Sequence, residues 1–185
     1  MKISTVRYYG GSRDKVCRLG LADLFLELQQ IILDTEIEIA EEKQANGAAE
    51  VRKAIDCGFA AGTDWVKVAS GGVDWSKRRR YNSSILVRIG VEIQVSARSD
   101  LLIRDIVHLR NSLQASEIDI GVIVVPSDQF QYFLTDRTPS MKDAIRYIET
   151  DLPEASKYPI IVMAIEHDKI GTPLKKMSTN RGKPK

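Results

Sequence analysis

A run in which every second side chain is apolar is the feature that most constrains how this chain can fold. β-Branched residues occupy every odd position from Ile85 to Val95. Because side chains alternate across a strand, this pattern predicts a strand over residues 85–96 with one continuous apolar face in a core. The other face places Glu92 and Gln94 side by side, so that a carboxylate and an amide point the same way.

The segment that follows predicts a helix and then a buried strand. Ser99 suits a helix N-cap, and apolar residues recur at helical spacing as far as about Gln114. Residues 118–125 are almost all apolar, which is typical of a central strand covered on both sides. Strand, helix and apolar strand together predict a right-handed βαβ unit with a parallel pair of strands.

The remaining patterns complete an α/β fold. Strands are expected over 2–9, 63–69, 73–76 and 158–165, and helices over 21–33, 48–56, 128–133 and 141–150. Gly71-Gly72 predicts a turn, and the basic run 77–82 predicts a loop. A chain of 185 residues favours one domain, which we place at 1–170, followed by a basic and flexible C-terminal tail at 171–185.

Charge and cysteine content narrow the class of protein. The formal net charge is only +2, but the tail carries five basic residues and no acidic one, and Lys77–Arg80 form a second basic focus. Local basic patches of this kind favour a polyanionic partner. Cys17 and Cys57 are not spaced as a metal or redox motif. Without a secretory signal or an apolar run of membrane-spanning length, we expect a cytoplasmic protein with no membrane partner.

The polar face of the central strand suits metal-dependent phosphodiester hydrolysis. Such chemistry needs a divalent cation held by oxygen ligands from separate elements. Glu92 offers a carboxylate, and the backbone carbonyl of Ile93 offers a second oxygen. Asp74 is the best candidate for the other carboxylate, because the segment after Gly71-Gly72 would pair with the strand that carries Glu92. Gln94 would orient the water or the phosphate, although a solvated amphipathic strand would show the same Glu-x-Gln pair.

The order of these motifs resembles a known family. Residues 91–100, then a helix, then 120–126 (Ile-Gly-Val-Ile-Val-Val-Pro), are similar to type II restriction endonucleases of the BglII and BstYI kind. The helix 48–55 with Gly58-Phe59 extends the resemblance over roughly 50–165. That group has the PD-(D/E)xK nuclease fold, a central mixed β-sheet flanked by helices in which a catalytic β-hairpin precedes a βαβ unit, with Gln in place of the usual Lys.

The resemblance implies an activity and a set of residues. It implies Mg²⁺-dependent cleavage of double-stranded DNA at a short palindrome by a homodimer, with a cognate DNA methyltransferase in the same system. Glu92, Gln94 and Asp74 match the catalytic positions of the group. The connection between Asp74 and Glu92 is longer than the family usually has, so Asp64 is an alternative to Asp74 as ligand. Glu50 could also reach the metal from its helix.

Several basic and polar residues are candidates for DNA contacts, either with phosphates or with base edges. They are Lys77, Arg78, Arg79, Arg80, Arg98 and Ser99. Two other functions stay open at this point. One is a repair or junction nuclease of the same fold that recognises DNA structure, and the other is a DNA-binding protein whose nuclease core has decayed.

Overall fold

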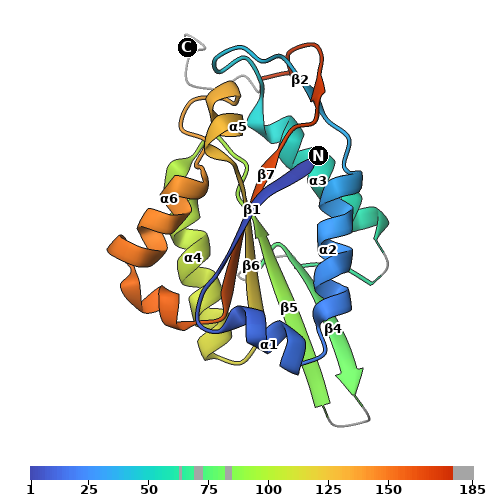
Figure 1. Ribbon diagram of the computed structural model, residues 1–185, viewed down its shortest axis with the longest axis vertical. Coiled ribbons are helices and arrows are strands. Elements are labelled where there is room, and N and C mark those ends of the chain that lie inside the picture. The colour runs from blue at the N-terminus through green and yellow to red at the C-terminus, as the bar shows by residue number, and fades with distance from the viewer. Residues whose placement is uncertain (63, 69–72, 82–84, 177–185) are drawn as a thin grey trace, which may run out of the picture.

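The computed structural model describes residues 1–62, 64–68, 73–81 and 85–176, and its centre is a mixed six-stranded β-sheet (Figure 1). The strands follow in the order β1 (Lys2–Tyr8), β7 (Ile160–Glu166), β6 (Ile120–Pro126), β5 (Ile85–Ile93), β4 (Trp75–Tyr81) and β3 (Val66–Lys67). β7, β6 and β5 run parallel, whereas β1, β4 and β3 pair antiparallel with their neighbours. The mixed sheet expected from the sequence is confirmed.

Helices cover both faces of this sheet, over two separate apolar cores. One face carries α2 (Ala22–Asp34) and α3 (Ala48–Ala61), and the other carries α4 (Ser99–Gln114) and α6 (Met141–Arg146) (Figure 1). The shorter elements are α1 (Ser12–Arg18), α5 (Asp128–Phe133), the π-helical turn η1 (Tyr147–Asp151), the 3₁₀ turn η2 (Pro153–Lys157) and a parallel pair of β2 (Glu38–Ile39) with β8 (Lys169–Ile170). None of the helices in the described ranges is long and apolar enough to cross a membrane.

The alternating pattern of β5 is confirmed, and both faces of the strand are covered. Ile89, Val91 and Ile93 are fully buried in the core beneath α2 and α3. On the opposite face α4 closes over the strand, and Glu92 is only 4% exposed. β5, α4 and β6 form the predicted βαβ unit, since β5 and β6 pair in parallel. Glu92 therefore lies between sheet and helix, not on a solvated face.

The basic run at 77–80 lies on strand β4, so the prediction of a loop there was wrong. β4 pairs with β5 along its whole length, so most of the long connection between Asp74 and Glu92 lies in these two paired strands. Charged residues are accommodated in the strand because alternate side chains find acidic partners on α2. Lys77 Nζ lies 2.7 Å from Glu27 Oε2, and Arg79 pairs with Asp23. Position 82, at the end of the expected loop, lies outside the described residues.

Other boundaries also differ from the sequence predictions. α3 passes through Gly58, where a Cβ atom would lie 3.1 Å from Cγ2 of Ile31 in α2 and 3.1 Å from Oγ1 of Thr35, the C-cap of α2. The glycine thus permits close packing of α2 on α3, and does not end the helix. α4 starts at Ser99 with Arg98 as its N-cap, so Ser99 is the first helical residue and not the cap.

Two further predicted segments are only partly described. Of the strand expected over 63–69, only Val66–Lys67 pairs as β3, while positions 63 and 69 and the turn at 70–72 lie outside the described residues. The first residues assigned to the tail contact the domain. Gly171 N donates to Ile39 O, and Leu174 N donates to Asn46 Oδ1. Residues 177–185 lie outside the described part of the chain.

Candidate active site

Acidic side chains from three elements converge at the carboxyl end of β5. Asp74 comes directly before β4, Glu92 lies on β5, and Asp105 lies on α4. The antiparallel register pairs Trp75 with Val91, which brings Asp74 beside the end of β5. Asp74 Oδ2 accepts a 2.8 Å hydrogen bond from the backbone N–H of Ile93. This bond fixes Asp74 to the backbone of Ile93, the residue directly after Glu92.

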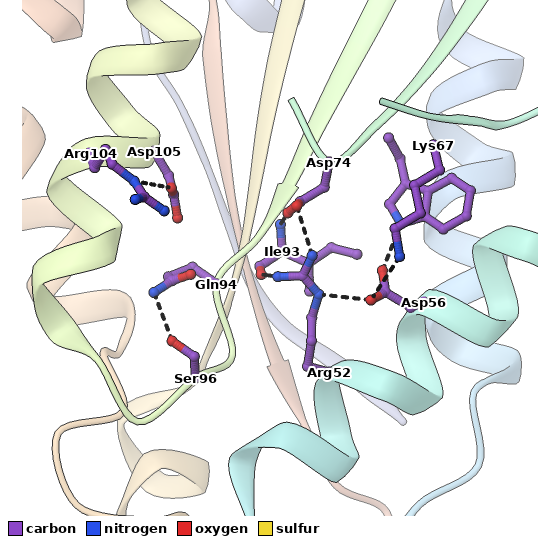
Figure 2. Close-up of polar contacts among 10 residues, drawn as sticks. Arg52, Asp56, Lys67, Asp74, Ile93, Gln94, Ser96, Arg104 and Asp105 are labelled. Atoms are coloured by element: carbon purple, nitrogen blue, oxygen red, sulfur yellow. Dashed lines mark hydrogen bonds and ion pairs between the residues drawn. The ribbon is translucent and has the colours of Figure 1, made fainter. Parts of the chain in front are cut away.

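Arg52, near the start of α3, extends its side chain toward Asp74 and Ile93 (Figure 2). Its Nη2 is 2.8 Å from Asp74 Oδ1, and its Nη1 donates to the carbonyl oxygen of Ile93. Its Nε lies 3.2 Å from Asp56 Oδ2 in the next turn of the helix. Trp75 Nε1 also donates to Asp56, at 2.8 Å. One guanidinium therefore contacts both the Asp74 carboxylate and the Ile93 carbonyl that the sequence offers to a cation.

Glu92 is in an unfavourable electrostatic environment. The pKa of its carboxyl is raised to about 10, first by burial and then by the negative charges of Asp74 and Asp105. The pKa of Asp105 is also raised, to about 6, first by burial and then by the charge of Asp74. Glu92 Oε1 is buried and has no hydrogen-bond partner among the described atoms. The three carboxylates thus interact through their charges, and the charge of Arg52 acts in the opposite direction on the pKa of both Glu92 and Asp105.

The donor set fits a hard divalent cation. Carboxylate and carbonyl oxygens are the ligands that Mg²⁺ accepts, and a cation would stabilise the ionised form of Glu92 that burial disfavours. A second group of possible ligands is also present, because one ligand atom each from Glu92, Asp105 and His108 lie within 4.8 Å of one another. Glu92 belongs to both groups.

Comparison with known families decides the class of the protein. The profile of restriction endonuclease BglII/BglIII matches residues 18–165, which is most of the chain. The chain belongs to the BglII/BglIII restriction endonuclease family. It is therefore a nuclease that acts on DNA. The matched region begins at residue 18, upstream of the roughly 50–165 on which the sequence resemblance rested. No curated protein matches the sequence.

Of the two aspartates considered as ligands in this family member, Asp74 is the one beside Glu92. Asp64 is exposed in the connection between α3 and β3 and has a positive φ of 63°. Glu50 is half-buried in the first turn of α3 and lines an open hollow with Arg52, Asp56 and Trp75. No hydrogen bond or ion pair joins Glu50 to the acidic group within the described residues, so its contact with a metal stays a prediction.

Gln94 follows β5 and is as buried as Glu92. Its backbone N–H donates to Val124 O at 2.8 Å, which prolongs the pairing with β6. Its side-chain Nε2 donates to Ser96 Oγ at 3.1 Å (Figure 2). The same Nε2 donates to Arg98 O, also at 3.1 Å. The amide thus also holds the short connection into α4 in place.

The structure separates the residues predicted to bind DNA into two sets. Lys77 and Arg79 point toward α2 and pair with its acidic residues, whereas Arg78 and Arg80 are exposed on the other side of β4. Arg98 is exposed and pairs with Asp100 beside the first turn of α4, where Ser99 is half-buried. DNA contacts by these residues stay predictions.

The sequence analysis did not single out three residues near Glu92, namely Arg52, Asp105 and His108. Arg52 lies one helical turn before Asp56, a spacing that is common on solvated helices. Asp105 lies in α4 next to Arg104 and looks like part of a polar face, and His108 is one turn further along. Whether these residues reach the site depends on which face of α3 and of α4 packs on the sheet. The apolar positions of each helix, which mark that face, were the signal that could have placed them.

Proposed function

We propose that this chain is a type II restriction endonuclease that hydrolyses phosphodiester bonds in double-stranded DNA at a short palindromic site, with Mg²⁺ as cofactor. The observation that carries the proposal is the bond between Asp74 and the backbone of Ile93, which sets a second carboxylate beside buried Glu92. Membership of the family supports the nuclease activity. The long connection between Asp74 and Glu92 would be the reason to suspect a decayed core, and the pairing of β4 with β5 along that connection supports an intact site.

Asp74, Glu92 and the carbonyl oxygen of Ile93 would hold the cation. A cation held there would supply Lewis-acid chemistry, polarising the phosphate and lowering the pKa of a bound water so that it can serve as the nucleophile. Glu92 must be ionised to serve as a ligand, so it gives up the proton that burial favours. Arg52 must release Asp74 and Ile93, and its guanidinium keeps Asp56 as a partner.

Gln94 would orient the attacking water. It is uncharged and lies next to Glu92 on the same side of the chain, and its Nε2 is already bonded to Ser96 and Arg98. The amide oxygen would accept a hydrogen bond from the water and direct a lone pair of the water toward the phosphorus. A fixed amide does this without adding another negative charge to a site that already holds three carboxylates.

A palindromic recognition site would require a symmetric dimer and a matching methyltransferase. A palindrome presents the same half-site twice, so two copies of this chain related by a two-fold axis would cut both strands. A DNA methyltransferase of the same specificity would protect host DNA from the enzyme.

Cleavage of unmethylated plasmid and linear DNA, with Mg²⁺ or with EDTA, tests this function. We expect discrete fragments with Mg²⁺ that disappear in Glu92→Ala and Asp74→Asn, while Asp64→Asn, the matched control, still cuts. Sequencing the fragment ends would give the recognition site. Cleavage confined to branched DNA would favour a structure-specific nuclease, and Mg²⁺-independent binding of DNA that stays intact would indicate a non-catalytic protein.

A further inference from the structure

We propose that Glu92, Asp105 and His108 form a second divalent-cation site on the α4 side of β5, suited to a first-row transition ion such as Mn²⁺. One ligand atom from each of the three residues lies within 4.8 Å of the other two. The inference goes beyond the proposed function, and the two proposals share Glu92 as a ligand.

The fold directs the two helical ligands at the strand. Asp105 and His108 are three residues apart on α4, so their side chains lie on one face of the helix. That face covers β5, since Asp105 is 7% exposed and His108 is half-buried. In Figure 2 Asp105 projects from α4 on one side of the chain near Gln94, and Asp74 with Arg52 lies on the other. The two groups therefore approach the end of β5 from opposite sides.

Glu92 supplies an independent observation that supports a ligand site here. Its Oε1 is buried and has no hydrogen-bond partner among the described atoms. A buried carboxylate oxygen is seldom left without a donor, a proton or a cation. The nearest positive charge on the α4 side is Arg104, whose Nε is 3.9 Å from Asp105 Oδ1 and whose side chain is 59% exposed. Water screens such a charge, so it leaves most of the negative charge unbalanced.

The ligand types determine which ion the site prefers. Two carboxylates and an imidazole offer mixed oxygen and nitrogen donors, whereas Mg²⁺ prefers oxygen alone. Mn²⁺ and its neighbours accept both kinds of donor. Within the described residues Arg52 forms its hydrogen bonds and ion pairs with Asp56, Asp74 and Ile93, and none with Glu92, Asp105 or His108, so an ion in this site need not displace it. The second site could therefore fill before Arg52 moves.

The chain contains only two histidines, His108 and His167, which makes the test specific. His167 is buried and bonds Glu41 through Nε2 at 2.9 Å, so it serves as the internal reference. Mn²⁺ would be added to DNA-free protein labelled with ¹⁵N in histidine. We expect the ring signals of one histidine to broaden first in NMR spectra, with a pulsed-EPR nitrogen coupling that changes from ¹⁴N to ¹⁵N with the label.

Variants then assign the coupling. His108→Gln should remove it and weaken binding of Mn²⁺ by about 10- to 100-fold, as loss of groups around a metal does. Asp105→Asn should weaken binding similarly, and His167→Gln should change neither. NMR spectra of each variant without metal would confirm folding. A nitrogen coupling that survives His108→Gln, or Mn²⁺ bound through oxygen alone, would overturn the inference.

These measurements need no DNA, so they separate the inference from the proposed function. Mn²⁺ bound to His108 in a protein that never cuts DNA would leave the inference standing and defeat the nuclease assignment. Mg²⁺-dependent cleavage that is unchanged in His108→Gln, together with no nitrogen coupling, would do the opposite.

Discussion

The guanidinium of Arg52 lies 2.8 Å from the carboxylate of Asp74, and the same group donates to the backbone carbonyl of Ile93. Arg52 thus holds two of the three ligands that a catalytic cation would need. Its charge stabilises the metal-free site, in which Asp74 would otherwise face Glu92 without compensation. Since one space cannot hold both, Arg52 and the catalytic cation should compete.

Arg52→Gln should show this competition. Loss of the partly buried ion pairs should lower the free energy of unfolding in EDTA by about 1–3 kcal/mol. The affinity for Mg²⁺ should rise severalfold, because no guanidinium has to leave. Urea unfolding and calorimetric Mg²⁺ titration would measure the two effects. Lys53→Ala, an exposed cation on the same helix, is the control and should change neither. Weaker Mg²⁺ binding in Arg52→Gln would instead make Arg52 a support for the metal site.

Glu92 should make the metal-free protein less stable as pH rises. Its folded pKa is raised from 4.5 to about 10, so between these values the folded protein keeps a proton that the unfolded chain has lost. Stability from this group is therefore complete below pH 4.5 and is lost as pH rises toward 10, with a slope of at most about 1.4 kcal/mol per pH unit.

Glu92→Gln keeps the shape of the side chain and cannot ionise. We expect its unfolding free energy in EDTA, minus that of the wild type, to increase between pH 6.5 and 8.5, above the raised pKa of Asp105. Mg²⁺ should stabilise the wild type more strongly as pH rises, because its binding displaces the proton. A difference that is independent of pH would contradict the burial of an acidic Glu92.

Gln94 should affect catalysis more than stability. Gln94→Ala removes the amide that would orient the water, and we expect kcat to fall about 100-fold or more. The two hydrogen bonds to Ser96 and Arg98 would also be lost, at about 1–2 kcal/mol of unfolding free energy. Ser96→Ala removes one of those partners and leaves the amide, so single-turnover cleavage should stay within a few fold. An equal loss of kcat in both variants would show that the amide only positions the loop.

The two faces of β4 should respond differently to mutation. Arg78 is exposed and should contact phosphate, so Arg78→Ala should reduce the slope of log K against log salt by about 0.9 in DNA-binding titrations in EDTA. Lys77 has a side chain that is 10% exposed and pairs with Glu27. Lys77→Ala should therefore cost about 1 kcal/mol of unfolding free energy and leave the salt slope unchanged. The reverse pattern would place DNA on the α2 face.

Local patterns in the sequence were enough to predict several elements. The short helix at 128–133 has the predicted bounds, and the helix before β6 ends at Gln114 as predicted and begins one residue earlier, at Ser99, because apolar periodicity and flanking residues act within the segment itself. The strand with Glu92 and the buried strand after α4 were also predicted, as was the parallel connection between them. Each of these depends on neighbours in the chain.

Contacts between distant segments decided what the patterns could not. The basic run became a strand because α2 supplies Glu27 and Asp23 as partners, and α3 passes through Gly58 because α2 packs closely there. Charge alone predicts a loop, and glycine alone predicts a helix end. In both places the tertiary neighbour reverses the local preference.

The candidate site divides in the same way. The sequence by itself determined that Glu92 and Gln94 share one side of a strand, because that follows from the period of two, and it placed Asp74 first among the other carboxylates. Only the tertiary structure decided that Arg52, Asp105 and His108 surround Glu92. Their distances along the chain carry no period, and the register of β4 on β5 and the faces of α3 and α4 bring them together. Burial of Glu92, and hence its raised pKa, arises from that packing and could not be predicted from the strand alone.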